Sequence, residues 1–270
     1  MKKREKFFIK LGEIISKTSS LTLFENVIKS TFYGIKGHEY SYFSDRNGEH
    51  ELMEYILSTC KKTNLVIFDG GCNRGDFTRD LIKVINKLKL ENFEIHLFDI
   101  DENMINKCNS RFRNFKNIKI NFFGLSDTNR YEEAIFYPND PTRNSLKGIA
   151  LEIGWDYFKS QVKLINGDSY CKKNKLKKID FLKLDLEGFD LEALKGFSKM
   201  FEEKRINFVQ FEYTFRALDR RILLRDFFEF FSDFDYEMGF IRKSGIKPIE
   251  KFDSRMNDWT LGPNFYAKPK

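Results

Sequence analysis

Charged side chains end two of the most apolar segments of the chain. Lys183, Asp185 and Glu187 close one segment, and Glu212 closes the next one. Carboxylates at such positions can remove a proton from a substrate or bind Mg²⁺. We therefore take Lys183, Asp185, Glu187 and Glu212 as candidate catalytic residues, and Asp185 and Glu212 as candidate magnesium ligands. The alternative is that Lys183 forms an ion pair with Asp185 or Glu187 and only orders the end of the strand.

A glycine-rich turn offers a second kind of chemistry. It follows the apolar run 65–68 and reads Asp69-x-Gly71-x-x-x-Gly75, with a helical pattern directly after it. Glycines let a ligand come close to the backbone, and the N-terminus of a helix carries a partial positive charge. Dinucleotide-binding turns read G-x-G-x-x-G. The spacing here instead favours the turn that binds the amino-acid end of S-adenosylmethionine.

A single carboxylate, Asp99, ends the next apolar run along the chain. A carboxylate in this position can accept hydrogen bonds from both hydroxyls of a ribose. Asp101 and Asn103 lie beside it, so capping of the following helix is the alternative role. The glycine-rich turn and the acid together in one unit predict a cofactor that contains a nucleoside.

These residues follow a regular alternation of strand and helix patterns, which predicts a doubly wound, mostly parallel sheet. The expected strands are 65–68, 93–98, 118–123, 179–185, 208–211, 236–242 and 264–267. The expected helices include 49–60, 76–88, 102–112, 191–195 and one around 223–231. The stretch 128–166 contains Pro138, Pro141 and Gly154 and is expected to form a loop over the ligand end of the sheet.

Two segments resemble the motifs of one enzyme family. Residues 68–78 resemble the FDVGANxGxxT turn of the FkbM-type methyltransferases, and residues 179–196 resemble that family's IDFLKIDVEGxExxVLKG signature. Residues 124–127 resemble a third conserved patch, and the resemblance spans about 50–270. The chain departs from the family pattern with Gly70 in place of Val, Cys72 in place of Ala, Arg74 in place of an aliphatic residue and Asp99 in place of Glu.

The resemblance implies an α/β, Rossmann-like class I methyltransferase with a central, mostly parallel seven-stranded sheet and helices on both faces. We expect a helical N-terminal extension over 1–49 and a methyltransferase domain over 50–270. The implied reaction is transfer of a methyl group from S-adenosylmethionine to a hydroxyl of a sugar, glycan or related small acceptor, as in polysaccharide biosynthesis. Carried over by position, the turn would bind the methionine part of the cofactor, Asp99 the ribose, and Ser126 and Asp127 the adenine side. The full set of expected cofactor-binding residues is Asp69, Gly70, Gly71, Asn73, Arg74, Gly75, Asp99, Ile100, Ser126 and Asp127.

Methyl transfer to a hydroxyl needs in-line alignment and removal of a proton. Asp185 or Glu212 could act as the base, or Mg²⁺ held by these two acids could lower the pKa of the hydroxyl. His96 falls within a predicted strand and is expected in the core. His38 and His50 stay open as alternatives that reach over from the N-terminal region.

The chain is basic, with a formal net charge of +7 and a pI of about 9.0. Its lysines are spread along the sequence rather than gathered in one stripe, so nucleic acid is not the expected partner. An RNA 2′-O-methyltransferase remains the alternative, because Lys183, Asp185 and Glu212 partly imitate the constellation of such enzymes. Tight, strongly salt-dependent RNA binding would favour it. A catalytically inactive methyltransferase fold that serves as a binding module is a further alternative, which failure to bind the cofactor would favour.

No apolar run approaches the roughly 20 residues of a membrane helix, and Lys10 and Glu13 interrupt the start too early for a signal peptide. The cysteines are scattered without a CxxC pair, as is typical of reduced thiols. We therefore expect a cytoplasmic protein without a transmembrane segment. Residues 5–17 predict an amphipathic helix that docks on the main domain, with weak membrane-surface contact as the alternative. A homodimer is compatible with the sequence.

Overall fold

The computed structural model describes residue 31 and residues 47–59, 64–147, 154–258 and 261–270. The predicted helix 5–17 and His38 lie outside the described residues, as does most of the predicted N-terminal extension. The described residues from 47 onward belong to one compact unit, and the fold and the site below belong to it.

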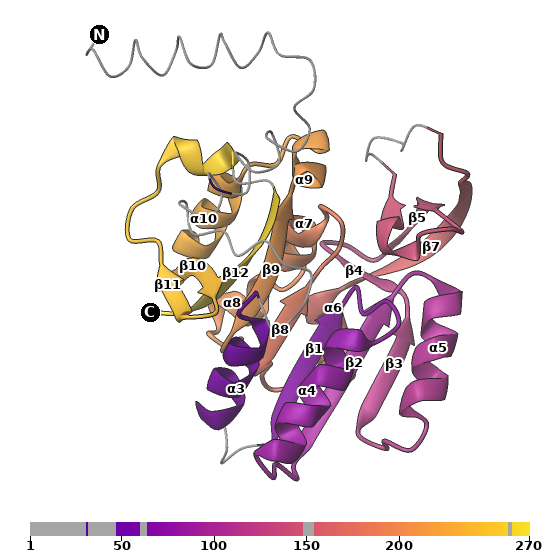
Figure 1. Cartoon of the computed structure of the whole chain (residues 1–270), viewed down its shortest axis with the longest axis horizontal. Helices are drawn as coiled ribbons and strands as arrows, with labels where there is room; N and C mark the ends of the chain where they lie inside the picture. Colours follow the sequence, from indigo (N-terminus) through magenta and orange to yellow (C-terminus); the bar gives the residue numbers. More distant parts are fainter. Residues whose placement is uncertain (1–30, 32–46, 60–63, 148–153, 259–260) are drawn as a thin grey trace, which may run out of the picture. The chain divides into compact units, whose positions relative to one another are not determined.

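An eight-stranded mixed sheet forms the centre of this unit (Figure 1), in the order β11-β10-β12-β9-β8-β1-β2-β3. The strands are β1 (Leu65–Gly70), β2 (Phe93–Asp99), β3 (Ile118–Phe122), β8 (Phe181–Leu184), β9 (Val209–Thr214), β10 (Tyr236–Arg242), β11 (Gly245–Pro248) and β12 (Leu261–Pro269). Neighbours from β3 to β9 run parallel, while β12 is antiparallel to both β9 and β10. The seven expected strands are therefore present, and the short, mostly exposed β11 adds an eighth by forming a tight hairpin with β10.

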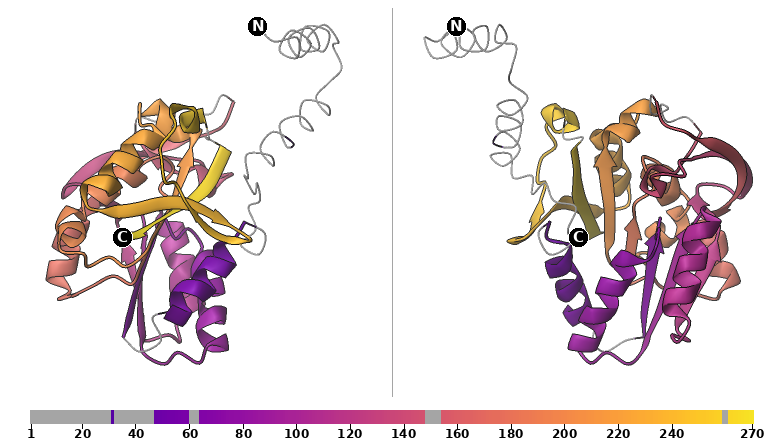
Figure 2. Two further views of the ribbon diagram at one scale, coloured as in Figure 1. Left: turned by 90° about the vertical axis from the view of Figure 1, so that its left-hand side faces the viewer. Right: turned by 45° about the vertical axis from the view of Figure 1, so that its right-hand side comes forward.

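Helices cover both faces of the sheet, as predicted (Figure 2). Alternate residues of a strand point to opposite faces, so Ile67 packs in one core and Val66 and Phe68 in the other. The first core includes residues of α3 (Glu49–Thr59), α4 (Asp76–Lys87) and α5 (Glu102–Phe112). The second includes residues of α6 (Gly167–Lys173), α7 (Asp190–Lys195), α8 (Ser198–Glu202), α9 (Phe215–Asp219) and α10 (Leu224–Asp233).

The expected loop 128–166 was the main error of the sequence-based prediction, because much of it belongs to a second sheet. This sheet has the order β4-β7-β5-β6, with β4 (Gly124–Ser126), β5 (Arg130–Phe136), β6 (Ser145–Leu146) and β7 (Phe158–Asn166). In β7 the side chains of Val162 and Leu164 are buried while Gln161 and Lys163 are exposed. This two-residue period is the signal of a strand, but it covers only residues 161–164, because residues 158–160 are exposed as well.

Two short 3₁₀ helices complete the described elements, η1 (Pro141–Arg143) and η2 (Ser254–Asp258). Glu212 lies within β9, which continues to Thr214, and not at its end as expected. None of the helices among the described residues is both long and apolar enough to cross a membrane.

Candidate functional site

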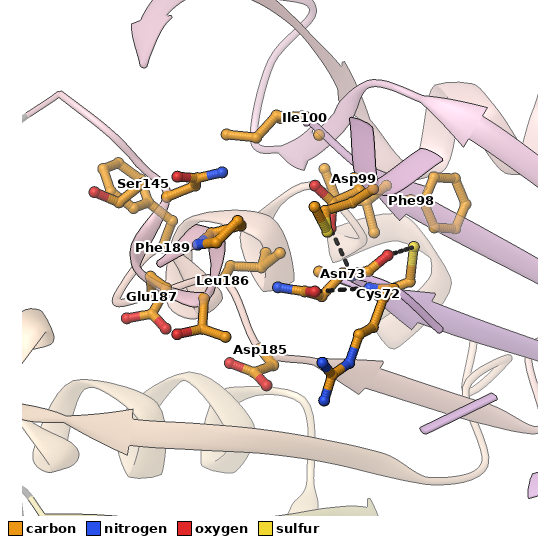
Figure 3. A pocket seen from close by; sticks show the side chains of 18 of the residues that line it. Cys72, Asn73, Phe98, Asp99, Ile100, Ser145, Asp185, Leu186, Glu187 and Phe189 are labelled. Carbon is orange, nitrogen blue, oxygen red and sulfur yellow. Dashed lines mark hydrogen bonds between the residues drawn. The ribbon is translucent and has the colours of Figure 1, made fainter. Parts of the chain in front are cut away.

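A pocket of about 510 Å³ lies at the ends of β1, β2 and β8, within the range of about 300–1,000 Å³ usual for small-molecule sites. Figure 3 shows Asp99 and Ile100 approaching it from one side, and Asp185 and Glu187 from another. The predicted site residues that line it are Gly71, Asn73, Arg74, Asp99, Ile100, Lys183, Asp185 and Glu187. The predicted residues Asp69, Gly70, Gly75, Ser126, Asp127 and Glu212 do not line it.

The turn after β1 is tight because its glycines allow it to be. Gly71 and Gly75 have positive φ angles of 70° and 78°, a region that favours glycine. A Cβ atom at Gly71 would lie 1.9 Å from the carbonyl oxygen of Asp185. The missing side chain therefore lets the ends of β1 and β8 come together, which brings Asn73 and Asp185 to one pocket.

Asp69 lies fully buried beneath the pocket and holds other residues in place. Its carboxylate accepts a hydrogen bond of 2.7 Å from the hydroxyl of Thr78 and lies 3.3 Å from Nζ of Lys183. Its role in this structure is thus to hold the β1 turn, through α4, and the side chain of Lys183.

Lys183 is buried among acids and remains a cation. Burial by itself would lower its pKa, but the charges of Asp69, Asp185 and Glu49 together raise the pKa above its ordinary value. Nζ lies 3.5 Å from the carboxylate of Asp185. The contribution of Glu49, from the first turn of α3, was missed by sequence reasoning, since no local pattern links positions so far apart in the chain. A lysine that keeps its proton can orient Asp185 but cannot serve as a base.

Asp99 is left free for a ligand because Asp101 caps the next helix. The carboxylate of Asp101 accepts the backbone N–H of Asn103 at 2.8 Å, as the N-cap of α5. Asp99 accepts backbone N–H groups from Asn73 at 2.7 Å and from Asp101 at 2.9 Å. Burial raises the pKa of Asp99 to about 6, and these two hydrogen bonds oppose the rise. Each carboxylate oxygen keeps a second lone pair that can accept a hydroxyl of a ligand.

The acids beyond β8 hold protons more strongly than usual. Burial and the charge of Asp185 raise the pKa of Glu187 to about 8, although Nε of the buried Arg216 lies 2.6 Å from its carboxylate. The same two causes raise the pKa of Asp190 to about 7. Burial, together with Asp185, Glu187 and Asp190, raises the pKa of Glu212 well above its ordinary value. Near neutral pH this group of acids therefore carries protons as well as negative charge.

The predicted magnesium site finds no support in the described part of the chain. No three His, Cys, Asp or Glu side chains among the described residues are arranged to hold a metal ion. Asp185 has the cation Lys183 as its ion-pair partner, and Glu212 does not line the pocket that Asp185 lines. We derive no step through a metal.

Ser126 and Asp127, expected on the adenine side, belong to a polar network around Glu192 of α7. The hydroxyl of Ser126 donates to Glu192 at 2.8 Å, and Arg130 contacts both Asp127 and Glu192. Arg220 contacts the other oxygen of Glu192. The network joins the second sheet to the main sheet, and neither Ser126 nor Asp127 lines the pocket.

Asn144, which sequence reasoning missed, fixes the pocket wall that the second sheet supplies. Its side-chain amide donates to Asp101 at 2.7 Å, and its side-chain oxygen accepts the backbone N–H of Tyr137 at 2.8 Å. Asn144 and the neighbouring Ser145 and Leu146 line the pocket. The stretch around Asn144 was predicted as loop. No local pattern marks a residue whose contact, Asp101, lies 43 positions away in the chain.

The described histidines do not line the pocket. His96 is fully buried, as predicted, with Nδ1 2.7 Å from the hydroxyl of Tyr170. Burial lowers the pKa of His96 to about 4, against the opposing charge of Glu94. His50 lies on α3, where its Nε2 is 3.1 Å from Glu54.

The strand order and the pocket at the strand ends define the Rossmann-like α/β fold of the class I S-adenosylmethionine-dependent methyltransferases. The Methyltransferase FkbM domain matches residues 73–241. The chain belongs to this family.

Similarity to solved structures is distant. A Streptococcus mutans protein in complex with S-adenosylhomocysteine is 12% identical, with a TM-score of 0.41 over 81% of this chain and 96% of that one. An rRNA methylase from Streptococcus thermophilus is 10% identical, with a TM-score of 0.39 over 81% and 94%. A SAM-dependent O-methyltransferase from Thermotoga maritima is 9% identical, with a TM-score of 0.41 over 82% and 64%. No curated protein matches the sequence.

Proposed function

We propose that this protein transfers the methyl group of S-adenosylmethionine to a hydroxyl of a sugar, glycan or related small acceptor. The observation that carries the proposal is that Asp99 and Asp185 line one pocket. Asp99 ends β2 and Asp185 directly follows β8, and these two strands flank β1 on its two sides. An acid that would bind the nucleoside and an acid that would act on the acceptor thus line the same pocket.

The residues on the β1 and β2 side would bind the cofactor. The glycine-rich turn with Asn73 would hold its methionine part, Asp99 its ribose, and Ile100 would pack beside its adenine. S-adenosylmethionine supplies a methyl group on a positively charged sulfur. The chain's own task is then to align the acceptor hydroxyl with that methyl group and to receive the proton of that hydroxyl.

Asp185 is our candidate for the base. Its side chain lies in the pocket and is 44% exposed, so an acceptor hydroxyl can reach it. The ammonium group of Lys183 orients its carboxylate. Glu187 lines the pocket and its pKa is raised to about 8, which fits a hydrogen-bond donor that positions an acceptor oxygen better than it fits a base.

Substitution of Asp185→Asn tests this assignment. We expect methyl transfer to fall by about 10²–10⁴-fold, the usual contribution of a general base, while affinity for S-adenosylhomocysteine changes little. Calorimetric titration gives the affinity, and a screen of nucleotide sugars and glycan fragments with radiolabelled methyl donor gives the turnover. The exposed Asp156→Asn is the control. Undiminished turnover in Asp185→Asn would remove this residue from catalysis, and a wild-type protein that binds no cofactor would instead favour a binding module.

Metal dependence has a separate test. We expect methyl transfer to continue at full rate after EDTA treatment, because the described acids do not form a metal site. The rate is measured in EDTA with and without added Mg²⁺ in excess. A rate that falls in EDTA and returns with Mg²⁺ would contradict proton transfer to a carboxylate alone.

A further inference from the structure

The cationic side chains among the residues that line the pocket are Arg74, Lys107 and Lys183. The charge of Lys183 is already matched by Asp69 and Asp185, at 3.3 and 3.5 Å. Lys107 lies on α5, where its Nζ is 3.9 Å from the sulfur of Met104, on the side of the pocket where Asp99 would bind the nucleoside. Arg74 alone lies on the glycine-rich turn.

Arg74 is held in position by Asp76, the first residue of α4. Nε of Arg74 donates to the carboxylate of Asp76, which also accepts Arg79 at 2.7 Å and Arg111 at 2.8 Å. Burial would raise the pKa of Asp76, but its arginine neighbours outweigh this effect and lower the pKa. Arg79 also contacts Asp80 at 3.1 Å, so three guanidinium groups face two carboxylates and leave an excess of positive charge at this corner of the pocket.

The two terminal amino groups of Arg74 are available for a ligand. Among the described residues no hydrogen-bond partner of these groups is found beyond the contact through Nε, and the side chain is 64% exposed. A guanidinium fixed through Nε presents both terminal groups in one plane, which matches the two oxygens of a carboxylate. The N-terminus of α4, whose N-cap residue Gly75 provides no side-chain cap, adds a favourable partial charge for an anion.

We propose that Arg74 binds the carboxylate of the methionine part of S-adenosylmethionine, so that the pocket selects cofactors with an intact amino-acid end. This inference rests on the proposed function, because it presumes the cofactor. It assigns a specific role to a residue that stands where the family pattern has an aliphatic side chain.

Binding of two ligands tests the inference without any acceptor. S-adenosylhomocysteine carries the amino-acid end, and 5′-methylthioadenosine keeps the nucleoside but lacks that end. We expect Arg74→Ala to weaken binding of S-adenosylhomocysteine by about ten-fold or more, the usual effect of losing a hydrogen bond to a charged group. The affinity for 5′-methylthioadenosine should stay within about two-fold of wild type, since this ligand has no carboxylate for Arg74 to bind. Isothermal titration calorimetry measures all four dissociation constants.

Arg79→Ala is the matched control, because Arg79 contacts the same carboxylate of Asp76 but does not line the pocket. It should leave both affinities as in wild type. Unchanged binding of S-adenosylhomocysteine by Arg74→Ala would overturn the inference, and so would an equal loss for the two ligands, which would indicate a general distortion of the turn. Failure of the wild-type protein to bind either ligand would instead contradict the proposed function.

Discussion

At the scale of single residues, the pKa values of the acids in the site are raised because several acids lie close together and few cations pair with them. Asp185, Glu187, Asp190 and Glu212 lie close enough for the charge of Asp185 to raise the pKa of each of the other three. Lys183 and Arg216 are the cations paired with this group. Full ionisation of all the acids would therefore leave negative charge that is poorly solvated, and protons are retained instead.

Asp190 gives the clearest prediction, because it is 1% exposed and burial with Asp185 raises its pKa to about 7. The native state then binds a proton that the unfolded state has released, so stability falls as pH rises through this range. The buried, neutral His96 makes the free energy of unfolding rise with pH, but only at pH values below its ordinary pKa of 6.5. We expect the free energy of unfolding to fall from pH 6.5 to pH 8, and Asp190→Asn to be more stable than wild type at pH 8 by about 1–3 kcal/mol.

Urea unfolding at several pH values measures both quantities. The exposed Asp156→Asn serves as the control and should follow the wild-type curve, because it removes a carboxylate that is exposed in both states. A pH dependence of Asp190→Asn as steep as that of wild type would show that this carboxyl does not hold the proton.

At the scale of elements, the turn between β1 and α4 decides whether the two halves of the pocket meet. Its backbone passes so close to β8 that only glycine fits at position 71. The same turn carries Asn73 and Arg74 on the outside and rests on the buried Asp69 through α4. The close approach of β1 and β8, and with it the ligand site, therefore depends on the glycine at position 71.

Gly71→Ala and Gly154→Ala form a matched pair that tests this dependence. Both positions have a positive φ, of 70° and 79°, so both alanine variants lose about 1 kcal/mol of backbone preference. A Cβ at Gly154 meets nothing within 4 Å, whereas one at Gly71 would lie 1.9 Å from the carbonyl oxygen of Asp185. We expect calorimetry to show at least a ten-fold loss of S-adenosylhomocysteine binding for Gly71→Ala and little change for Gly154→Ala. Equal affinities in the two variants would mean that the close approach does not matter for the ligand.

At the scale of the whole compact unit, the second sheet must be fixed to the main sheet for the pocket to have its outer wall. Glu192 makes this connection from α7, through Arg130 of β5, Ser126 of β4 and Arg220. The side chain of Glu192 is 15% exposed, and those of its two arginine partners are 30% and 20% exposed. A half-buried ion-pair network of this kind holds a wall in place more than it adds to total stability.

Glu192→Ala should therefore remove the carboxylate that pairs with Arg220 and one of the three that pair with Arg130. We expect the free energy of unfolding to fall by about 2 kcal/mol, less than the 3–5 kcal/mol typical of a fully buried pair because solvent screens this one. Binding of S-adenosylhomocysteine should weaken as well, since Asn144 and Leu146 lose their support. Glu132→Gln, which removes a more exposed partner of Arg130, should cost much less. Similar losses in the two variants, measured by urea unfolding, would contradict a central role for Glu192.

The sequence by itself determined the unit made of β1, the glycine-rich turn, α4 and β2. It also placed Asp99 at the end of β2 and Asp185 directly after β8. It also determined the fold class, since apolar periodicity and glycine spacing are local and can be read along the chain, and it indicated the family through the two segments that resemble its motifs. The second sheet was lost because the alternation of buried and exposed residues in β7 covers only residues 161–164 of a mostly polar segment. The eighth strand was lost because β11 is short and mostly exposed.

Only the tertiary structure decided which of the predicted residues share the pocket. It placed Asp69 beneath the pocket, Ser126 and Asp127 in a network with Glu192, and Glu212 within β9. It also decided which acids hold protons, because a pKa depends on burial and on charges that neighbouring strands bring together. Glu49 and Lys183, far apart along the chain, affect each other in this way, and no pattern in the sequence records a distance of that kind.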